Sequence, residues 1–116
     1  METRSLANDL RIAIVGCGSM GQRHIGNLIS LGLHPVVAVD PVEDQRRMIH
    51  EKFDLRTVAD LDDIWALSPD VVFVTSPSNL HLSHALKSAE HGCHLFIEKP
   101  LSHSLEGVAG LMAAIE

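Results

Sequence analysis

Short apolar runs alternate along the chain with longer segments in which apolar residues recur at every third or fourth position. A continuous apolar run predicts a buried strand, and the longer period predicts an amphipathic helix. The runs predict five strands, at residues 10–15, 35–40, 55–58, 70–77 and 94–100. The periodic segments predict five helices, at residues 24–32, 41–53, 60–68, 80–92 and from 104 onward.

The alternation of strands and helices predicts one α/β domain over residues 1–116, a Rossmann-type doubly wound parallel sheet. We expect the strand order 3-2-1-4-5, with strand 55–58 at one edge and strand 94–100 at or beside the other. The chain is 46% hydrophobic but only 3% aromatic, so the core should be aliphatic. Ligands of such a sheet bind beyond the carboxyl ends of its strands, where the strand order reverses.

Three glycines, Gly16, Gly18 and Gly21, lie between the first strand and the first helix. In this context their spacing is typical of a dinucleotide-binding turn. Gly16 allows the tight turn, Gly18 lets a diphosphate approach the main chain, and Gly21 lets the helix pack closely on the strand. The amides of Ser19, Met20 and Gly21 would then face an anion at the N-terminus of a helix.

Asp40 ends the second strand, about 20 residues after these glycines, where a carboxylate binds the hydroxyls of a ribose. Because Asp40 would repel a 2′-phosphate, we expect NAD to be preferred over NADP. Arg46 and Arg47, on the following helix, are expected to project into solvent. Two alternatives remain open, a turn that binds no phosphate and a methyltransferase site for S-adenosylmethionine. The complete glycine triad counts against the methyltransferase.

The amino-acid composition of the chain limits the kinds of molecule that it is expected to bind. Fifteen acidic and nine basic residues give a net charge of −6, which argues against binding to nucleic acid. Residues 1–9 contain no signal-peptide core and no run reaches transmembrane length, so we expect a cytoplasmic protein that does not bind membranes. Cys17 and Cys93 are expected to be reduced thiols. His81 and His84 could contact one metal, but no third ligand lies near them in sequence, so no metal site is expected.

Two further segments follow the fourth and fifth strands, TSPSNLHLSHAL and FIEKPLS. Together with the glycine turn, they resemble the glucose–fructose oxidoreductase, inositol dehydrogenase and rhizopine catabolism (GFO/IDH/MocA) family. The first domain of that family carries Pro-x-x-x-His after strand four and Glu-Lys-Pro after strand five. The matching residues here are Pro77, His81, Glu98, Lys99 and Pro100. The similarity extends from Leu10 to about Ser104 and implies the NAD-binding Rossmann domain of an oxidoreductase.

The resemblance also implies the remaining site residues. The cofactor groove would be lined by Thr75, Ser76 and Pro77, and its wall would be shaped by Asn79 and His81. Glu98 and Lys99 would lie near the nicotinamide. Lys99 would be the catalytic residue, in contact with the substrate hydroxyl or carbonyl, because a lysine there can polarise the oxygen and stabilise developing negative charge.

Members of this family continue into a second α/β domain that supplies most of the substrate pocket, and we expect that domain to be absent from these 116 residues. The resemblance therefore implies the cofactor-binding domain of a dehydrogenase that acts on CH–OH groups of sugars, polyols or related small molecules, inactive without a substrate domain. The alternatives are a non-catalytic sensor of NAD(H) and a remnant that binds nothing. The apolar strand 94–100, at or beside an edge, predicts self-association or a partner subunit.

Overall fold

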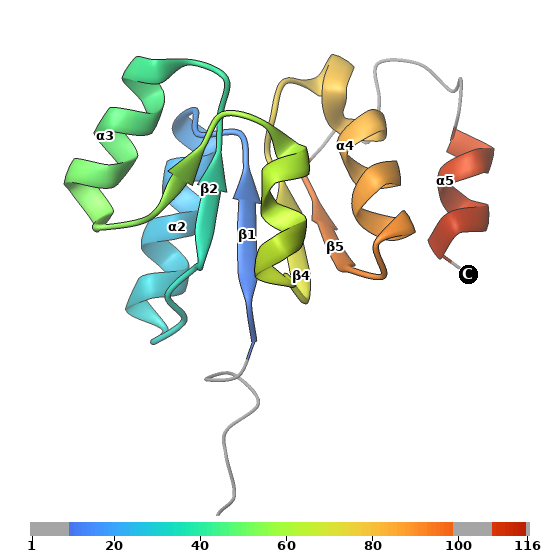
Figure 1. Ribbon diagram of the computed structural model, residues 1–116, viewed down its shortest axis with the longest axis horizontal. Coiled ribbons are helices and arrows are strands. Elements are labelled where there is room, and N and C mark those ends of the chain that lie inside the picture. The colour runs from blue at the N-terminus through green and yellow to red at the C-terminus, as the bar shows by residue number, and fades with distance from the viewer. Residues whose placement is uncertain (1–9, 99–107, 116) are drawn as a thin grey trace, which may run out of the picture.

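The computed structural model describes residues 10–98 and 108–115, and within them five strands form one parallel sheet in the order β3-β2-β1-β4-β5 (Figure 1). The strands are β1 (Ile12–Val15), β2 (Val37–Val39), β3 (Thr57–Val58), β4 (Val71–Val74) and β5 (His94–Ile97). This arrangement confirms the predicted fold class and strand order. It places β1 and β4 side by side at the point where the order reverses.

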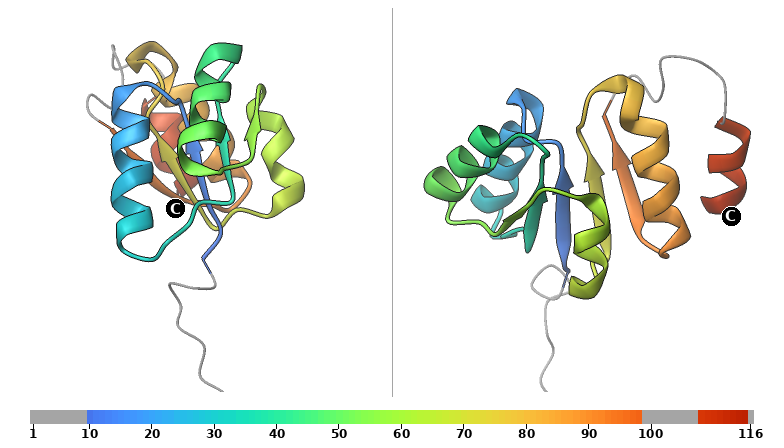
Figure 2. Two further views of the ribbon diagram at one scale, coloured as in Figure 1. Left: turned by 90° about the vertical axis from the view of Figure 1, so that its left-hand side faces the viewer. Right: turned by 45° about the horizontal axis from the view of Figure 1, so that its top comes forward.

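Helices cover both faces of the sheet (Figure 2). They are α2 (Ser19–Ser30), α3 (Glu43–Phe53), the 3₁₀ helix η1 (Leu61–Leu67), α4 (Ser78–Glu90) and α5 (Val108–Ile115). One core cluster joins the sheet to α2 and α3, and the other joins it to η1, α4 and α5. None of the helices within the described residues is long and apolar enough to cross a membrane.

The central strand β1 is buried along its whole length. Ala13 and Val15 pack on the η1 and α4 side of the sheet, while Ile12 and Ile14 pack on the α2 and α3 side. The buried clusters are built from aliphatic side chains, as the composition predicts. A strand fixed from both faces and both edges gives the turn that follows it a rigid base.

Two helix starts differ from the prediction. The first helix begins at Ser19, immediately after the glycine turn, rather than near His24. The second begins at Glu43, so the expectation that Pro41 is its first residue is wrong. Asp40 causes this difference, because its Oδ1 accepts a hydrogen bond from the amide of Val42 at 2.9 Å and turns the chain before the helix.

The third predicted helix is confirmed in position but is a 3₁₀ helix. Its cap is the predicted one, since Asp60 Oδ1 accepts a hydrogen bond from the amide of Asp62 at 3.0 Å. It ends at Leu67, and the backbone of the following residue, Ser68, is left-handed with φ at 51°.

The β5 side of the molecule leaves apolar surface exposed. Within residues 10–98 and 108–115, β5 pairs with β4 alone and forms an edge of the sheet, as predicted. Phe96 on this strand is 44% exposed. Beyond the strand, α5 packs on α4 through the buried Leu111, while Met112 and Ile115 are each 55% exposed.

The candidate dinucleotide groove

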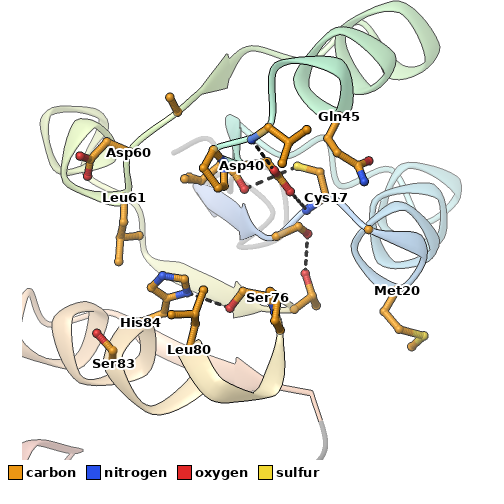
Figure 3. Close-up of a pocket in the computed structure, with 18 of the residues that line it drawn as sticks. Cys17, Met20, Asp40, Gln45, Asp60, Leu61, Ser76, Leu80, Ser83 and His84 are labelled. Atoms are coloured by element: carbon orange, nitrogen blue, oxygen red, sulfur yellow. Dashed lines mark hydrogen bonds between the residues drawn. The ribbon is translucent and has the colours of Figure 1, made fainter.

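A cavity of about 640 Å³ opens at the carboxyl edge of the sheet, at the predicted switch point between β1 and β4 (Figure 3). Five segments line it: the turn after β1, the start of α3 with the loop before it, the segment entering η1, the loop after β4, and one side of α4. Eight of the predicted cofactor-binding residues lie on its wall: Gly16, Gly18, Ser19, Met20, Asp40, Thr75, Ser76 and Pro77.

The three glycines of the turn meet three different surroundings. Gly16 has φ at +98°, and a Cβ on it would lie 2.4 Å from the amide nitrogen of Ser76. A Cβ on Gly21 would lie 2.0 Å from the carbonyl oxygen of Gly16. A Cβ on Gly18 would meet nothing within 4 Å. The fold itself therefore requires glycine at 16 and 21, whereas at Gly18 the missing side chain leaves open space beside the main chain.

The turn is fastened to both neighbouring strands. The amide of Gly16 donates to the carbonyl of Val39 on β2 at 2.8 Å. On the other side, the hydroxyl of Thr75 donates to the carbonyls of Val15 and Gly16, at 3.0 and 2.8 Å. These bonds lie within the protein, so they fix the shape of the turn without a ligand.

The N-terminus of α2 faces the groove. Among the described residues no side chain caps it, and its first intrahelical bond runs from the amide of Gln22 to the carbonyl of Gly18 at 3.0 Å. The amides of the first turn therefore have no partner within the helix, and the helix dipole is positive at this end. Such an end can hold the negative charge of a diphosphate.

Asp40 lies on the groove wall across from this helix end (Figure 3). It is buried, and its Oδ2 accepts a hydrogen bond from the amide of Cys17 at 2.9 Å while its Oδ1 accepts from Val42. Each carboxylate oxygen can accept more than one hydrogen bond, so lone pairs remain for a ligand hydroxyl. The two amide bonds orient Asp40 and join the loop after β2 to the glycine turn.

The two arginines that follow Asp40 behave differently. Arg47 is exposed and lies near the carboxylates of Glu43 and Asp44, at 3.4 and 3.7 Å, as expected for a solvated side chain. The same expectation for Arg46 is wrong. Arg46 is half-buried, and its Nη1 donates to the main-chain carbonyl of Asp40 at 2.8 Å. It therefore stabilises the loop that carries Asp40.

Cys17 lines the groove, but its thiol stays protonated and is therefore a poor nucleophile. Burial of its thiol raises its pKa to about 12, the carboxylate of Asp40 adds to the rise, and the charge of Arg46 opposes it. Its Sγ lies 3.6 Å from the carbonyl of Val39. The thiol is thus neutral near pH 7 and packs as part of the core.

Two histidines of α4 hold the loop after β4. The Nε2 of His81 is hydrogen-bonded to the carbonyl of Ser76, and the Nδ1 of His84 lies 2.7 Å from the hydroxyl of the same serine. Burial lowers the pKa of His84, with smaller contributions from His81 and Lys87, so His84 is neutral near pH 7. His81 is buried behind the loop and does not line the groove, and neither does the exposed Asn79. Their predicted part in shaping the groove wall stays a prediction.

Glu98 is bonded to the first helix and is not among the residues that line the cavity. Its Oε2 lies 2.8 Å from the Nε2 of His24 on α2, and the imidazole makes edge contacts with the rings of Phe73 and Phe96. The predicted place of Glu98 beside the nicotinamide stays a prediction. Lys99, its neighbour and the predicted catalytic residue, lies outside the described residues.

Sequence reasoning missed twelve residues of the groove wall: Cys17, Val39, Pro41, Val42, Gln45, Ala59, Asp60, Leu61, Leu80, Ser83, His84 and Lys87. Two signals could have found most of them. Residues 59–61 follow the carboxyl end of β3, which lies at the same sheet edge as the other site segments. The α4 residues recur at helical spacing on the side of the helix that faces the groove. Within the described residues, no cluster of three or more His, Cys, Asp or Glu could hold a metal ion.

Comparison with known proteins identifies relatives of the whole described fold. The GFO/IDH/MocA model, described as an oxidoreductase family with an NAD-binding Rossmann fold, matches residues 10–116. D-glucoside 3-dehydrogenase of Escherichia coli is 34% identical over 86% of this chain and 30% of its own length. Inositol 2-dehydrogenase of Burkholderia multivorans is 34% identical over 90% of this chain and 33% of its own length.

Solved structures of dehydrogenases resemble this chain in fold as well. The scyllo-inositol dehydrogenase of Lactobacillus casei, crystallised with NAD(H) and scyllo-inositol, superposes with a TM-score of 0.83 at 27% identity. The match covers 91% of this chain and 32% of that enzyme. The chain thus spans about a third of the length of the relatives it matches.

Proposed function

The chain belongs to the GFO/IDH/MocA family of oxidoreductases with an NAD-binding Rossmann fold, and on that premise we propose that it holds NAD(H) in the groove between β1 and β4. The observation that carries the proposal is the placement of Asp40. Amides of Cys17 and Val42 fix its carboxylate on the groove wall, across from the open space at Gly18. Family membership also decides against the methyltransferase alternative.

The residues present fit a dinucleotide. A groove of about 640 Å³ is in the usual range for small-molecule sites. The amides of Ser19 and Met20 bind the diphosphate, and Asp40 accepts hydrogen bonds from the adenosine ribose. The carboxylate of Asp40 repels a 2′-phosphate, so NAD is preferred over NADP. Thr75, Ser76 and Pro77 form the opposite wall of the groove.

The reaction belongs to the same proposal. A bound nicotinamide supplies the acceptor or donor of a hydride, and the residues of this chain bind and orient it. Lys99 polarises the oxygen of the substrate hydroxyl or carbonyl, a role that rests on the family's Glu-Lys-Pro motif. Because relatives that this chain matches are named for inositol and for glucosides, we propose a sugar or polyol CH–OH group as the substrate class.

We propose further that the protein is cytoplasmic and that its β5 side takes a partner, either a second copy or a substrate-binding subunit. Two exposed apolar sites support such a contact: Phe96 at the sheet edge, and Met112 with Ile115 on α5. Light scattering across micromolar concentrations should detect association of the isolated chain, and a strict monomer throughout would remove self-association.

Calorimetric titration with NADH and NADPH tests the cofactor. We expect saturable binding of NADH and weaker binding of NADPH. Asp40→Ala should weaken NADH and narrow the difference between the two dinucleotides, because the ribose acceptor and the repulsive charge are lost together. Unchanged selectivity in this variant would refute the role of Asp40, and no binding of NADH by the wild type would refute the proposal. Dehydrogenase assays on a panel of polyols, with and without a substrate-binding partner, separate an enzyme from a sensor of NAD(H).

A further inference from the structure

Gln45 carries a buried acceptor that nothing in the described part of the chain satisfies. It lies at the start of α3, lines the groove, and points toward the turn between β1 and α2 beside Cys17 (Figure 3). Its Oε1 is shielded from solvent and has no hydrogen-bond partner among the described residues. A buried polar atom without a partner costs free energy, and native proteins rarely keep one without a reason.

Several polar side chains near Gln45 in the sequence or at the turn do have hydrogen-bond partners. Asp40 is bonded to the amides of Cys17 and Val42, and Arg46 is bonded to the carbonyl of Asp40. The only other glutamine, Gln22, donates from Nε2 to the carbonyl of Cys17 at 3.1 Å. The acceptor of Gln45 is therefore unsatisfied, and a rotation of the carboxamide about its last bond would present it to a donor that enters the groove.

The chemistry of the expected ligand supplies such a donor. If the groove holds NAD(H), as proposed above, the ribose beside Asp40 brings hydroxyl groups to this end of the groove. A 2′-phosphate brings negatively charged acceptors to the same place and no hydroxyl proton at that position. An amide oxygen there favours the hydroxyl and disfavours the phosphate.

We propose that Gln45 is a second determinant of dinucleotide choice, which accepts a hydrogen bond from the 2′-hydroxyl of the adenosine ribose next to Asp40. This inference rests on the proposed function and adds a residue to it. It assigns selectivity to two side chains that approach the sugar from the loop after β2 and from the first turn of α3.

The test compares Gln45→Met with Gln22→Met by fluorescence titration with NADH and NADPH and by urea unfolding. Gln45→Met keeps the length of the side chain and removes the acceptor. We expect the Kd for NADH to rise about five- to tenfold and that for NADPH by less than about threefold, as loss of one hydrogen bond implies. The unfolding midpoint should not fall, because an unsatisfied buried atom has been removed. Gln22→Met loses a bond that exists, so its midpoint should fall while the ratio of the two Kd values stays within about twofold of wild type.

Gln45→Glu tests whether an oxygen acceptor alone is sufficient, because it keeps the acceptor and replaces the amide group by a carboxylate. A carboxylate accepts from a hydroxyl but repels phosphate, so this variant should retain NADH and lose NADPH. The inference is overturned if Gln45→Met changes both Kd values equally or neither, if its midpoint falls with NADH binding intact, or if Gln45→Glu abolishes NADH binding. Failure of the wild type to bind either dinucleotide overturns the proposed function and this inference together, whereas NADH binding with an unmoved ratio overturns the inference alone.

Discussion

The carboxyl edge of the sheet has two halves that are built in different ways. On the β1 and β2 half, hydrogen bonds donated by main-chain amides connect Gly16 to the carbonyl of Val39 and Cys17 to the carboxylate of Asp40, which makes one rigid unit. On the β4 and β5 half, side chains make the connections. His81 and His84 hold the loop after β4, and Glu98 is bonded to His24 across the sheet face.

The first half contains residues that the fold requires, whereas the second half contains residues whose positions could accept other side chains. Main-chain bonds on the first half depend on glycine and on one carboxylate, so few sequences satisfy them. The second half relies on side chains at positions that other residues could occupy, and it borders the exposed surface at Phe96. Substitutions should therefore have their largest effects on stability at the first half and progressively smaller effects toward β5.

The largest effect is expected from Gly16→Ala. The new Cβ would meet Ser76 at 2.4 Å with the backbone at φ +98°, so we expect a loss of about 3 kcal/mol in the free energy of unfolding. Urea denaturation followed by circular dichroism measures it. Gly18→Ala is the matched control, since its Cβ meets no atom within 4 Å.

Gly18→Ala should cost about 1 kcal/mol or less, the difference between glycine and alanine at a helix N-cap. Its Kd for NADH should nevertheless rise at least about tenfold, because the methyl group occupies the space that the diphosphate needs. Equal destabilisation by the two alanines would contradict the division between a structural and a ligand-facing glycine.

On the second half, His81→Ala should produce an intermediate effect. It removes a buried ring and its bond to the carbonyl of Ser76, and we expect a loss of about 2 kcal/mol in unfolding free energy. His84→Ala, on the groove side of the same helix, removes a less buried ring and should cost less. A His84 variant that is the more damaging of the pair would show that the loop is held from the groove side instead.

Much of this pattern could be predicted from the sequence. The strand order, the switch point and the placement of Gly16, Gly18 and Asp40 follow from local rules, because a short turn leaves few conformations and a strand end has a definite edge. Pro41 is a case in which a local rule gave the wrong prediction. Proline is common as the first residue of a helix, but the bond from Val42 to Asp40 delays the start of α3.

The contacts that the sequence did not predict depend on packing between distant segments. Glu98 is bonded to His24, which lies 74 positions away in the chain. Gln45 and Leu61 carry no motif and reach the groove only because α3 and η1 pack beside the same sheet edge. No pattern within one segment contains that information.

Cys17, on the first half, should make the free energy of unfolding depend on pH. Its pKa in the folded chain is raised to about 12 from 9.0, so the folded state favours the neutral thiol. The associated stability is complete below pH 9 and is lost as the pH rises toward 12, because the unfolded chain releases this proton first. At pH 10 we expect a loss of about 1 kcal/mol relative to pH 8. Cys17→Ser should remove most of this dependence in urea unfolding, whereas Cys93→Ser, at a half-buried thiol, should retain it.

The smallest effect is expected at the far end of the second half, from Glu98→Gln. The bond between Glu98 and His24 is partly exposed, with 27% and 18% of the respective side chains accessible, so solvent weakens it. We expect a loss of no more than about 1 kcal/mol in the free energy of unfolding. Urea unfolding of wild type, Glu98→Gln, His24→Gln and the double variant gives the coupling between the two residues directly. A coupling above about 2 kcal/mol would mean that this half of the edge is as tightly built as the glycine turn, and the contrast between the halves would fail.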